Sequence, residues 1–143
     1  MNAEISFFVE GDIKHPFFGK ENDYRQWLIK VAKAEKKTVK LLNYIFCSDE
    51  YLLDINIKYL GHDYYTDIIT FPYQQDQFIE SDLYLSIDRI EDNAKEYGET
   101  FHNELLRVMV HGLLHLMGYG DKSEADARLM REKEDCYVAV FLG

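Results

Sequence analysis

Few residues in this sequence are of the kinds that mark secreted or membrane-spanning proteins. Among 143 residues there are 2 cysteines and 2 prolines, and the cysteines lack C-x-x-C spacing. No apolar run reaches the roughly 18 residues of a membrane helix, and the N-terminal region lacks the features of a signal peptide. We therefore expect a cytoplasmic protein without a membrane partner, in which Cys47 and Cys136 are buried, reduced thiols.

Positive charge is also in short supply. Lys and Arg number 16 against 26 Asp and Glu, so the formal net charge is −10. Proteins dedicated to nucleic acids usually carry a basic patch, whereas the basic cluster at residues 30–37 has the pattern of a solvated helix face. The charge disfavours DNA as a partner. Any RNA must be recognised through local geometry or within a preassembled ribonucleoprotein.

Hydrophobic residues are abundant, at 47% of the chain with 15% aromatic, which predicts a folded core and one domain over residues 1–143. Apolar periodicity predicts strands at residues 5–9, 38–47, 67–71 and 82–87, the last two forming a hairpin around a polar turn at residues 74–77. It predicts helices at residues 22–34, 49–60, 88–97, 101–117 and 123–137, with Ser48, Thr100 and Ser123 as N-caps and Gly61 ending the second. Strands come first and helices gather at the C-terminal end, so we expect an α+β fold.

The most specific chemical signal is an H-x3-H-x2-G-x2-D pattern near the C-terminus. His111 and His115 are four residues apart on a predicted helix, so both imidazoles lie on one face and can meet one tetrahedral metal ion. Gly118 permits the left-handed turn that ends the helix and brings Asp121 back beside the histidines. The pattern predicts one divalent ion, zinc first, held by His111, His115 and Asp121, with the metal-bound water as the reactive group.

Two other kinds of site share parts of this pattern. A structural zinc site is usually closed by four protein ligands and is often rich in cysteine, whereas neither cysteine lies near this motif. The spacing also matches the metzincin metalloproteases, with Asp121 in place of their third histidine. Those enzymes carry a general-base Glu directly after the first histidine, where this chain has Gly112, which cannot accept a proton. A metallopeptidase therefore remains an alternative, but one that lacks its base.

The same stretch resembles the YbeY family of bacterial metal-dependent endoribonucleases, which act in ribosomal RNA maturation. The family motif is close to H-G-x-L-H-L-x-G-Y-D-H, and residues 111–121 read HGLLHLMGYGD. A second family block, L-N-x-x-Y-R-x-K-D-x-P-T-D-V-L-S-F-P, aligns with residues 55–72, and a third, G-D-I-x-I-S, aligns with residues 81–86. The three blocks occur in the family's order.

The resemblance implies a small mixed β-sheet packed with helices, with the metal-ligand helix near the C-terminus. The family's third histidine ligand maps to Asp121, which carries a negative charge. With this ligand set the metal should lower the pKa of its bound water less than with three neutral histidines, and Mn²⁺ should compete better with zinc. The family's arginine maps to Leu60, which cannot stabilise a phosphate in the transition state. Lys58, His62 and Arg107 are the candidate replacement cations.

The function implied is that of a zinc-dependent, single-strand-specific endoribonuclease in ribosomal RNA maturation and ribosome quality control. Its partner would be ribosomal RNA or a ribosomal subunit. The alternatives are the metallopeptidase and a non-enzymatic ribosome-assembly factor with a structural metal. The oligomeric state stays open.

Four other residues near these blocks receive structural interpretations. We expect Tyr59 and Phe71 to be core residues rather than RNA-stacking platforms, and Asp67 to accept hydrogen bonds from backbone N–H groups in a turn. Glu104 precedes His111 by two helical turns, so it either orients a ligand histidine or is a surface carboxylate.

Overall fold

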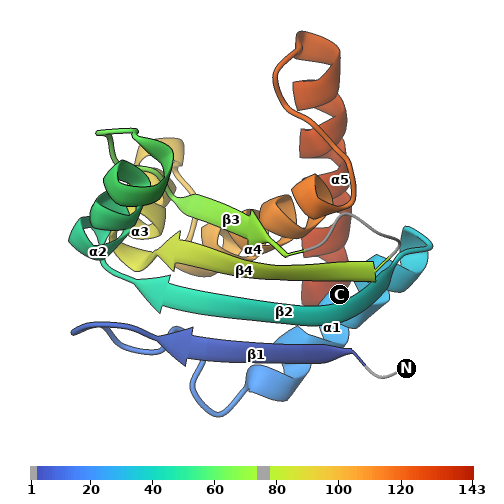
Figure 1. Cartoon of the computed structure of the whole chain (residues 1–143). Coiled ribbons are helices and arrows are strands. Elements are labelled where there is room, and N and C mark those ends of the chain that lie inside the picture. Colours follow the sequence, from blue (N-terminus) through green and yellow to red (C-terminus); the bar gives the residue numbers. More distant parts are fainter. Residues whose placement is uncertain (1–2, 74–77) are drawn as a thin grey trace.

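The sheet has four strands in the spatial order β1-β2-β4-β3 (Figure 1). The computed structural model describes residues 3–73 and 78–143, which contain the strands β1 (Glu4–Val9), β2 (Thr38–Cys47), β3 (Ile68–Pro72) and β4 (Phe78–Ser86). β1 and β4 both run parallel to β2, whereas β3 runs antiparallel to β4. The predicted hairpin is confirmed, although its polar turn at residues 74–77 lies outside the described residues.

Apart from the end of the last helix, the helical segments begin and end close to the predicted positions. They are α1 (Glu21–Ala34), α2 (Asp49–Ile55), the π-helical turn η1 (Asn56–Leu60), α3 (Ile87–Tyr97), α4 (Phe101–Leu116) and α5 (Glu124–Leu142). The hydroxyls of Ser48, Thr100 and Ser123 each accept a bond from a backbone N–H three residues later, at 3.0–3.2 Å, so the three predicted caps are confirmed. The α+β class with a small mixed sheet is confirmed as well. Within the described residues, no helix is both long and apolar enough to cross a membrane.

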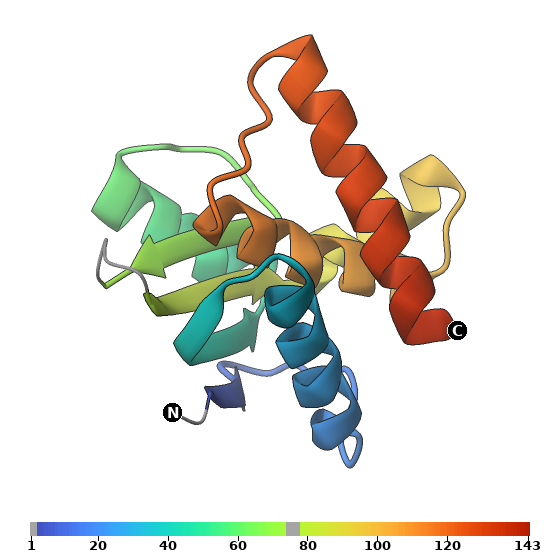
Figure 2. The ribbon, with the colours of Figure 1, turned by 90° about the vertical axis from the view of Figure 1, so that its right-hand side faces the viewer.

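Helices cover the two faces of the sheet unequally (Figure 2). One face packs against α4, with α1, α3 and α5 around it, whereas α2 covers part of the opposite face at one end. Tyr44 of β2 is fully buried, and its hydroxyl donates to the carbonyl of Met109 in α4 at 3.0 Å. The indole Nε1 of Trp27 in α1 donates to the carbonyl of Tyr137 in α5 at 2.8 Å. These buried bonds join α4 and α5, the helices that carry the site, to the rest of the fold.

The last helix is longer than the sequence analysis predicts. It ends at Leu142 rather than near residue 137. The extra turn is stabilised by Phe141, whose ring lies 4.7 Å from the ring of Tyr24 and 5.3 Å from that of Trp27. Packing against α1, which local periodicity does not report, extends the helix.

Two burial predictions are wrong. Cys136 is exposed, and only Cys47 is the buried thiol that was expected; both are free. Tyr59 is 62% exposed rather than a core residue, because it lies at the end of the π-helical turn with its ring edge against Phe71. Phe71 itself is partly buried against the smaller hydrophobic cluster under α2, as expected.

Candidate metal centre

Helix α4 presents two histidine rings on the face that approaches β3 and β4. The rings of His111 and His115 lie 4.6 Å apart, as expected for side chains one helical turn from each other. Gly112, between them, lets the helix come close to the sheet: a Cβ there would lie 2.5 Å from Cδ1 of Ile68 and 2.8 Å from Cδ2 of Leu83. Position 112 therefore packs against the sheet, and no general base can be accommodated there without displacing these side chains.

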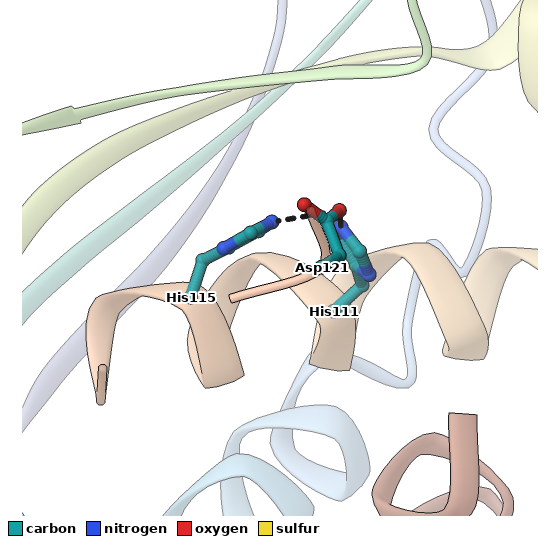
Figure 3. Close-up of side chains that lie close together, drawn as sticks. All are labelled: His111, His115 and Asp121. Atoms are coloured by element: carbon teal, nitrogen blue, oxygen red, sulfur yellow. Dashed lines mark hydrogen bonds and ion pairs between the residues drawn. The ribbon is translucent and has the colours of Figure 1, made fainter. Parts of the chain in front are cut away.

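The chain reverses directly after α4 and returns to the histidines. Gly118 adopts φ +105°, a left-handed conformation in which an L side chain would be strained. The turn leads to Asp121, whose Oδ2 lies 3.6 Å from Nε2 of His111 and 3.3 Å from Nε2 of His115 (Figure 3). The structure thus brings the three predicted residues together, with one ligand atom from each inside a cluster 4.8 Å across.

The donor set fits a divalent metal ion. Zinc binds imidazole nitrogen and carboxylate oxygen at about 2.0–2.1 Å in a tetrahedron, so two of its ligand atoms are about 3.4 Å apart. The separations of 3.3 and 3.6 Å from Asp121 to the two histidines match that spacing. All three side chains are partly or fully exposed, and three protein donors leave a tetrahedral position for water or substrate.

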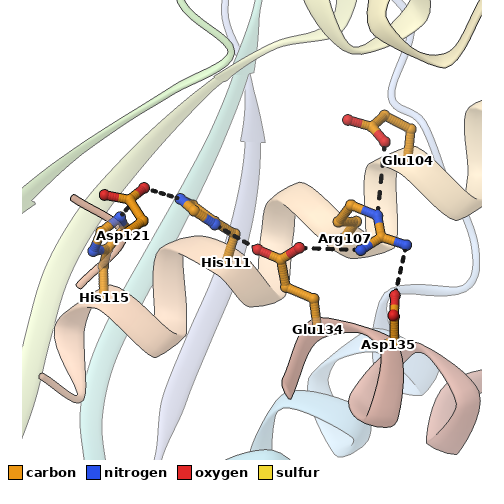
Figure 4. Close-up of polar contacts among 7 residues, drawn as sticks. All are labelled: Glu104, Arg107, His111, His115, Asp121, Glu134 and Asp135. Atoms are coloured by element: carbon orange, nitrogen blue, oxygen red, sulfur yellow. Dashed lines mark hydrogen bonds and ion pairs between the residues drawn. The ribbon is translucent and has the colours of Figure 1, made fainter. Parts of the chain in front are cut away.

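Glu134 of α5 contacts the His111 ring on the side opposite Asp121 (Figure 4). Its Oε2 lies 2.6 Å from Nδ1 of His111, so Nδ1 carries the hydrogen and Nε2 is left to face Asp121. Burial acts to lower the pKa of His111, but the hydrogen bond and charge of Glu134 outweigh it, and the pKa is raised. The Glu134 side chain is only 7% exposed, and Arg107 anchors its other oxygen at 3.1 Å. Glu134 is therefore a positioning residue for His111.

Neither of the two roles expected for Glu104 is found. Glu104 is buried, and no hydrogen bond joins it to His111; its nearest cation is Nε of Arg107, at 3.9 Å. Glu104 is thus neither the predicted orienting group nor a surface carboxylate, and burial raises its pKa. A signal for Glu134 does exist in the sequence, because it shares a helix face with Met130, Tyr137 and Val138. A carboxylate inside an apolar stripe requires a polar partner.

The three residues form part of the wall of an open pocket of about 580 Å³. The rest of the lining comes from η1, the loop that follows it and β3: Asn56, Leu60, His62, Tyr64, Thr66, Asp67, Ile68, Ile69, Thr70 and Pro72, with Gly112 and Leu116 from α4. Burial raises the pKa of the Asp67 carboxyl, while the backbone N–H groups of Asp67 and Ile68 act to lower it. The pocket therefore brings two carboxylates, Asp67 and Asp121, to the metal centre.

The pocket carries little positive charge. Of the described residues that line it, none is Lys or Arg. Nζ of Lys58 lies over the ring of Tyr59, 5.5 Å from its centroid, and Arg107 is engaged by Glu134 and by Asp135 at 2.9 Å. Of the three candidate cations, only His62 lines the pocket, beside Leu60.

Comparisons with known proteins agree with this geometry. Residues 12–141 match the protein-family model described as Endoribonuclease YbeY. The chain is 50% identical over 121 residues to Endoribonuclease YbeY of Flavobacterium johnsoniae, which covers 85% of this chain and 87% of that protein. It is 47% identical over 141 residues to Endoribonuclease YbeY of Cytophaga hutchinsonii, with 98% of each chain covered. The solution structure of TM1509 from Thermotoga maritima superimposes with a TM-score of 0.69 at 31% identity, covering 96% of this chain and 88% of that one. The chain belongs to the YbeY family.

Proposed function

We propose that this protein is a metal-dependent endoribonuclease that cuts single-stranded RNA. Its substrate would be ribosomal RNA or a ribosomal subunit, in RNA maturation and ribosome quality control in the cytoplasm, with residues 1–143 acting as one domain. The observation that carries the proposal is the three-donor cluster at an open pocket, in a chain whose curated relatives are named endoribonucleases.

His111, His115 and Asp121 would hold one zinc ion, with Mn²⁺ as the competing ion. When bound, the ion supplies an acidified water and polarises a phosphoryl oxygen. Glu134 would keep Nε2 of His111 on the side of the Asp121 carboxylate, where the ion would bind, and the reversal at Gly118 would keep that carboxylate in place. Compared with a third imidazole, the Asp121 carboxylate favours the binding of metals that prefer oxygen ligands.

The pocket residues suggest how the chain would treat an RNA strand. With no Lys or Arg among the described lining residues, stabilisation of charge on the phosphate would depend on the ion. We therefore expect the reaction to require the metal ion, because the described lining offers no Lys or Arg that could replace it.

Two alternatives remain distinguishable. A metallopeptidase requires a base after the first histidine, and the tight packing around Gly112 disfavours one. A non-enzymatic assembly factor with a structural metal is compatible with the net charge of −10 and with Leu60. It predicts a large fall in melting temperature when the metal is removed, and no cutting of any RNA.

The test is RNA cleavage by protein purified without chelators and analysed for metal. A labelled single-stranded fragment of ribosomal RNA is incubated with the zinc- or manganese-loaded protein and with its His111→Ala/His115→Ala variant. We expect the variant to lose both its metal and its cutting, whereas His102→Ala, at the far end of the same helix, keeps both. Cutting by the metal-free double variant would contradict the proposal, and casein digestion without RNA cutting would favour the peptidase.

A further inference from the structure

We propose that His62 and Tyr64 form a base-stacking platform beside the metal centre, and that stacking rather than cationic contacts holds the RNA strand there. This inference rests on the proposed function and names the part of the pocket that would contact a nucleobase. Both residues line the same pocket as His111, His115 and Asp121.

The two rings are already arranged as a stack. Their centroids are 5.2 Å apart with an interplanar angle of 16°, and the Tyr64 hydroxyl lies 3.0 Å from Nδ1 of His62. The pair is open to solvent, with Tyr64 56% exposed. Two nearly parallel, exposed rings at a pocket wall offer a flat π-face on which another aromatic ring can stack.

A buried asparagine fixes the backbone of both residues. Asn56 is 1% exposed; its side-chain Nδ2 donates to the carbonyl of Tyr64 at 2.9 Å, and its backbone carbonyl accepts from the N–H of His62 at 3.1 Å. Gly61, at φ +69°, ends η1 directly before the pair. Because the loop is already held in this way, little of its conformational entropy is lost when a base stacks on it.

Charge makes stacking the better source of affinity at this site. Single-stranded nucleic acids are held by positively charged grooves, by aromatic stacking, or by both. The described lining of this pocket has no Lys or Arg and contains two carboxylates, Asp67 and Asp121. Every base has a π-face, so stacking also tolerates sequence variation in the substrate.

Other exposed aromatic residues do not share this position. Tyr59 faces a separate small pocket with Phe71 and Tyr84, and its ring is covered by Lys58. Tyr97, at the end of α3, is 63% exposed and absent from the pocket lining, so it serves as a matched control.

The test compares two fluorescein-labelled 12-nucleotide 2′-O-methyl RNAs, one with bases and one with abasic sugars at its central positions. Fluorescence anisotropy gives the Kd of each for the zinc-loaded wild type, Tyr64→Ala, Tyr64→Phe, His62→Ala and Tyr97→Ala, and a gel verifies that the probes stay intact. We expect Tyr64→Ala to weaken binding of the base-containing RNA by about 5-fold or more, the lower end of the stacking range. Tyr64→Phe and Tyr97→Ala should bind as the wild type does.

The abasic probe separates stacking from a merely structural role. It should bind weakly to every protein, with no further loss in Tyr64→Ala, because the lost contact is to a base. Equal weakening of both probes, or an unchanged Kd in both Tyr64→Ala and His62→Ala, would overturn the platform while leaving RNA cutting by the wild type intact. A wild type that neither binds nor cuts RNA would instead overturn the proposed function, and this proposal with it.

Discussion

At the scale of single residues, the site depends on a carboxylate that does not belong to the donor set. Glu134 reaches from α5 to Nδ1 of His111 at 2.6 Å, and Arg107 anchors it from the other side at 3.1 Å. Such a partner selects the tautomer and orientation of a metal-binding histidine and makes its other nitrogen a stronger ligand for the metal. The affinity of the site for zinc should therefore depend on a residue that does not contact the ion.

Replacing Glu134 with Gln should weaken zinc binding by about 10- to 100-fold, the usual effect of losing such a partner. The measurement is competition with a chromophoric chelator at neutral pH. Glu132→Gln, an exposed position on the same helix, is the control and should bind zinc as the wild type does. Equal zinc affinity in Glu134→Gln and the wild type would show that the hydrogen bond has no positioning role.

At the scale of the elements, one carboxylate joins three segments: the end of α1, the loop that follows α4, and α5. Glu35, directly after α1, accepts hydrogen bonds from the hydroxyl of Tyr119 at 2.5 Å, from Nζ of Lys133 at 3.1 Å and from the hydroxyl of Tyr137. Tyr119 lies between Gly118 and Asp121, in the loop that returns to the histidines. These hydrogen bonds therefore join the loop that follows α4, and α5, to the end of α1.

The stabilising effect of Glu35 should depend on pH. Burial acts to raise its pKa, but the bonds from Tyr119, Tyr137 and Lys133 outweigh it, and the pKa is lowered from its usual value of 4.5. A lowered pKa in the folded state stabilises the fold above pH 4.5, and this contribution is lost as the pH falls through the folded-state pKa.

Glu35→Gln should therefore lower the free energy of unfolding at pH 7 by roughly 1–3 kcal/mol, as for a lost hydrogen bond to a charged group. The gap to the wild type should narrow as the pH falls below 4.5. Urea unfolding of both proteins between pH 3 and pH 8 measures it. A gap that stays constant or widens toward low pH would be inconsistent with a carboxylate in this role.

Local patterns predicted most element boundaries and the approach of Asp121 to the two histidines, for physical reasons. Caps such as Ser48 and the spacing of His111, His115 and Asp121 act over three to ten residues, a range that sequence periodicity reports directly. Glu134 was missed because its contact crosses from α5 to α4, and only its place in an apolar stripe hinted at it.

At the scale of the whole molecule, the arrangement of the strands explains where the pocket forms. The hairpin of β3 and β4 is local and was predicted, whereas the parallel pairing of β2 with β4 joins strands that are not consecutive and required the structure. β3 is one of the two edge strands of the sheet (Figure 1). It packs against α4, and the ring of Phe71 in β3 lies 5.9 Å from the ring of Tyr59 in η1. At this edge, His62 and Tyr64 line the same pocket as His111, His115 and Asp121.

The acidic chain should bind RNA with a shallow dependence on salt. Each phosphate neutralised in a single strand contributes a slope of about −0.7 to the logarithm of affinity against the logarithm of salt concentration. With no Lys or Arg among the described pocket residues, we expect affinity for an unstructured RNA to fall by less than about tenfold between 50 and 200 mM salt. Anisotropy titrations at four salt concentrations measure the slope, and a value steeper than about −2 would point to a basic binding track elsewhere on the molecule.

The proposed activity depends on one divalent ion bound by His111, His115 and Asp121. A crystal of the zinc-loaded protein, with an anomalous difference map recorded at the zinc absorption edge, tests whether these residues bind the ion. We predict a single strong peak within bonding distance of Nε2 of His111, Nε2 of His115 and a carboxylate oxygen of Asp121. A map with no peak at these three residues, or with its strongest peak elsewhere, would show that they are not the zinc site.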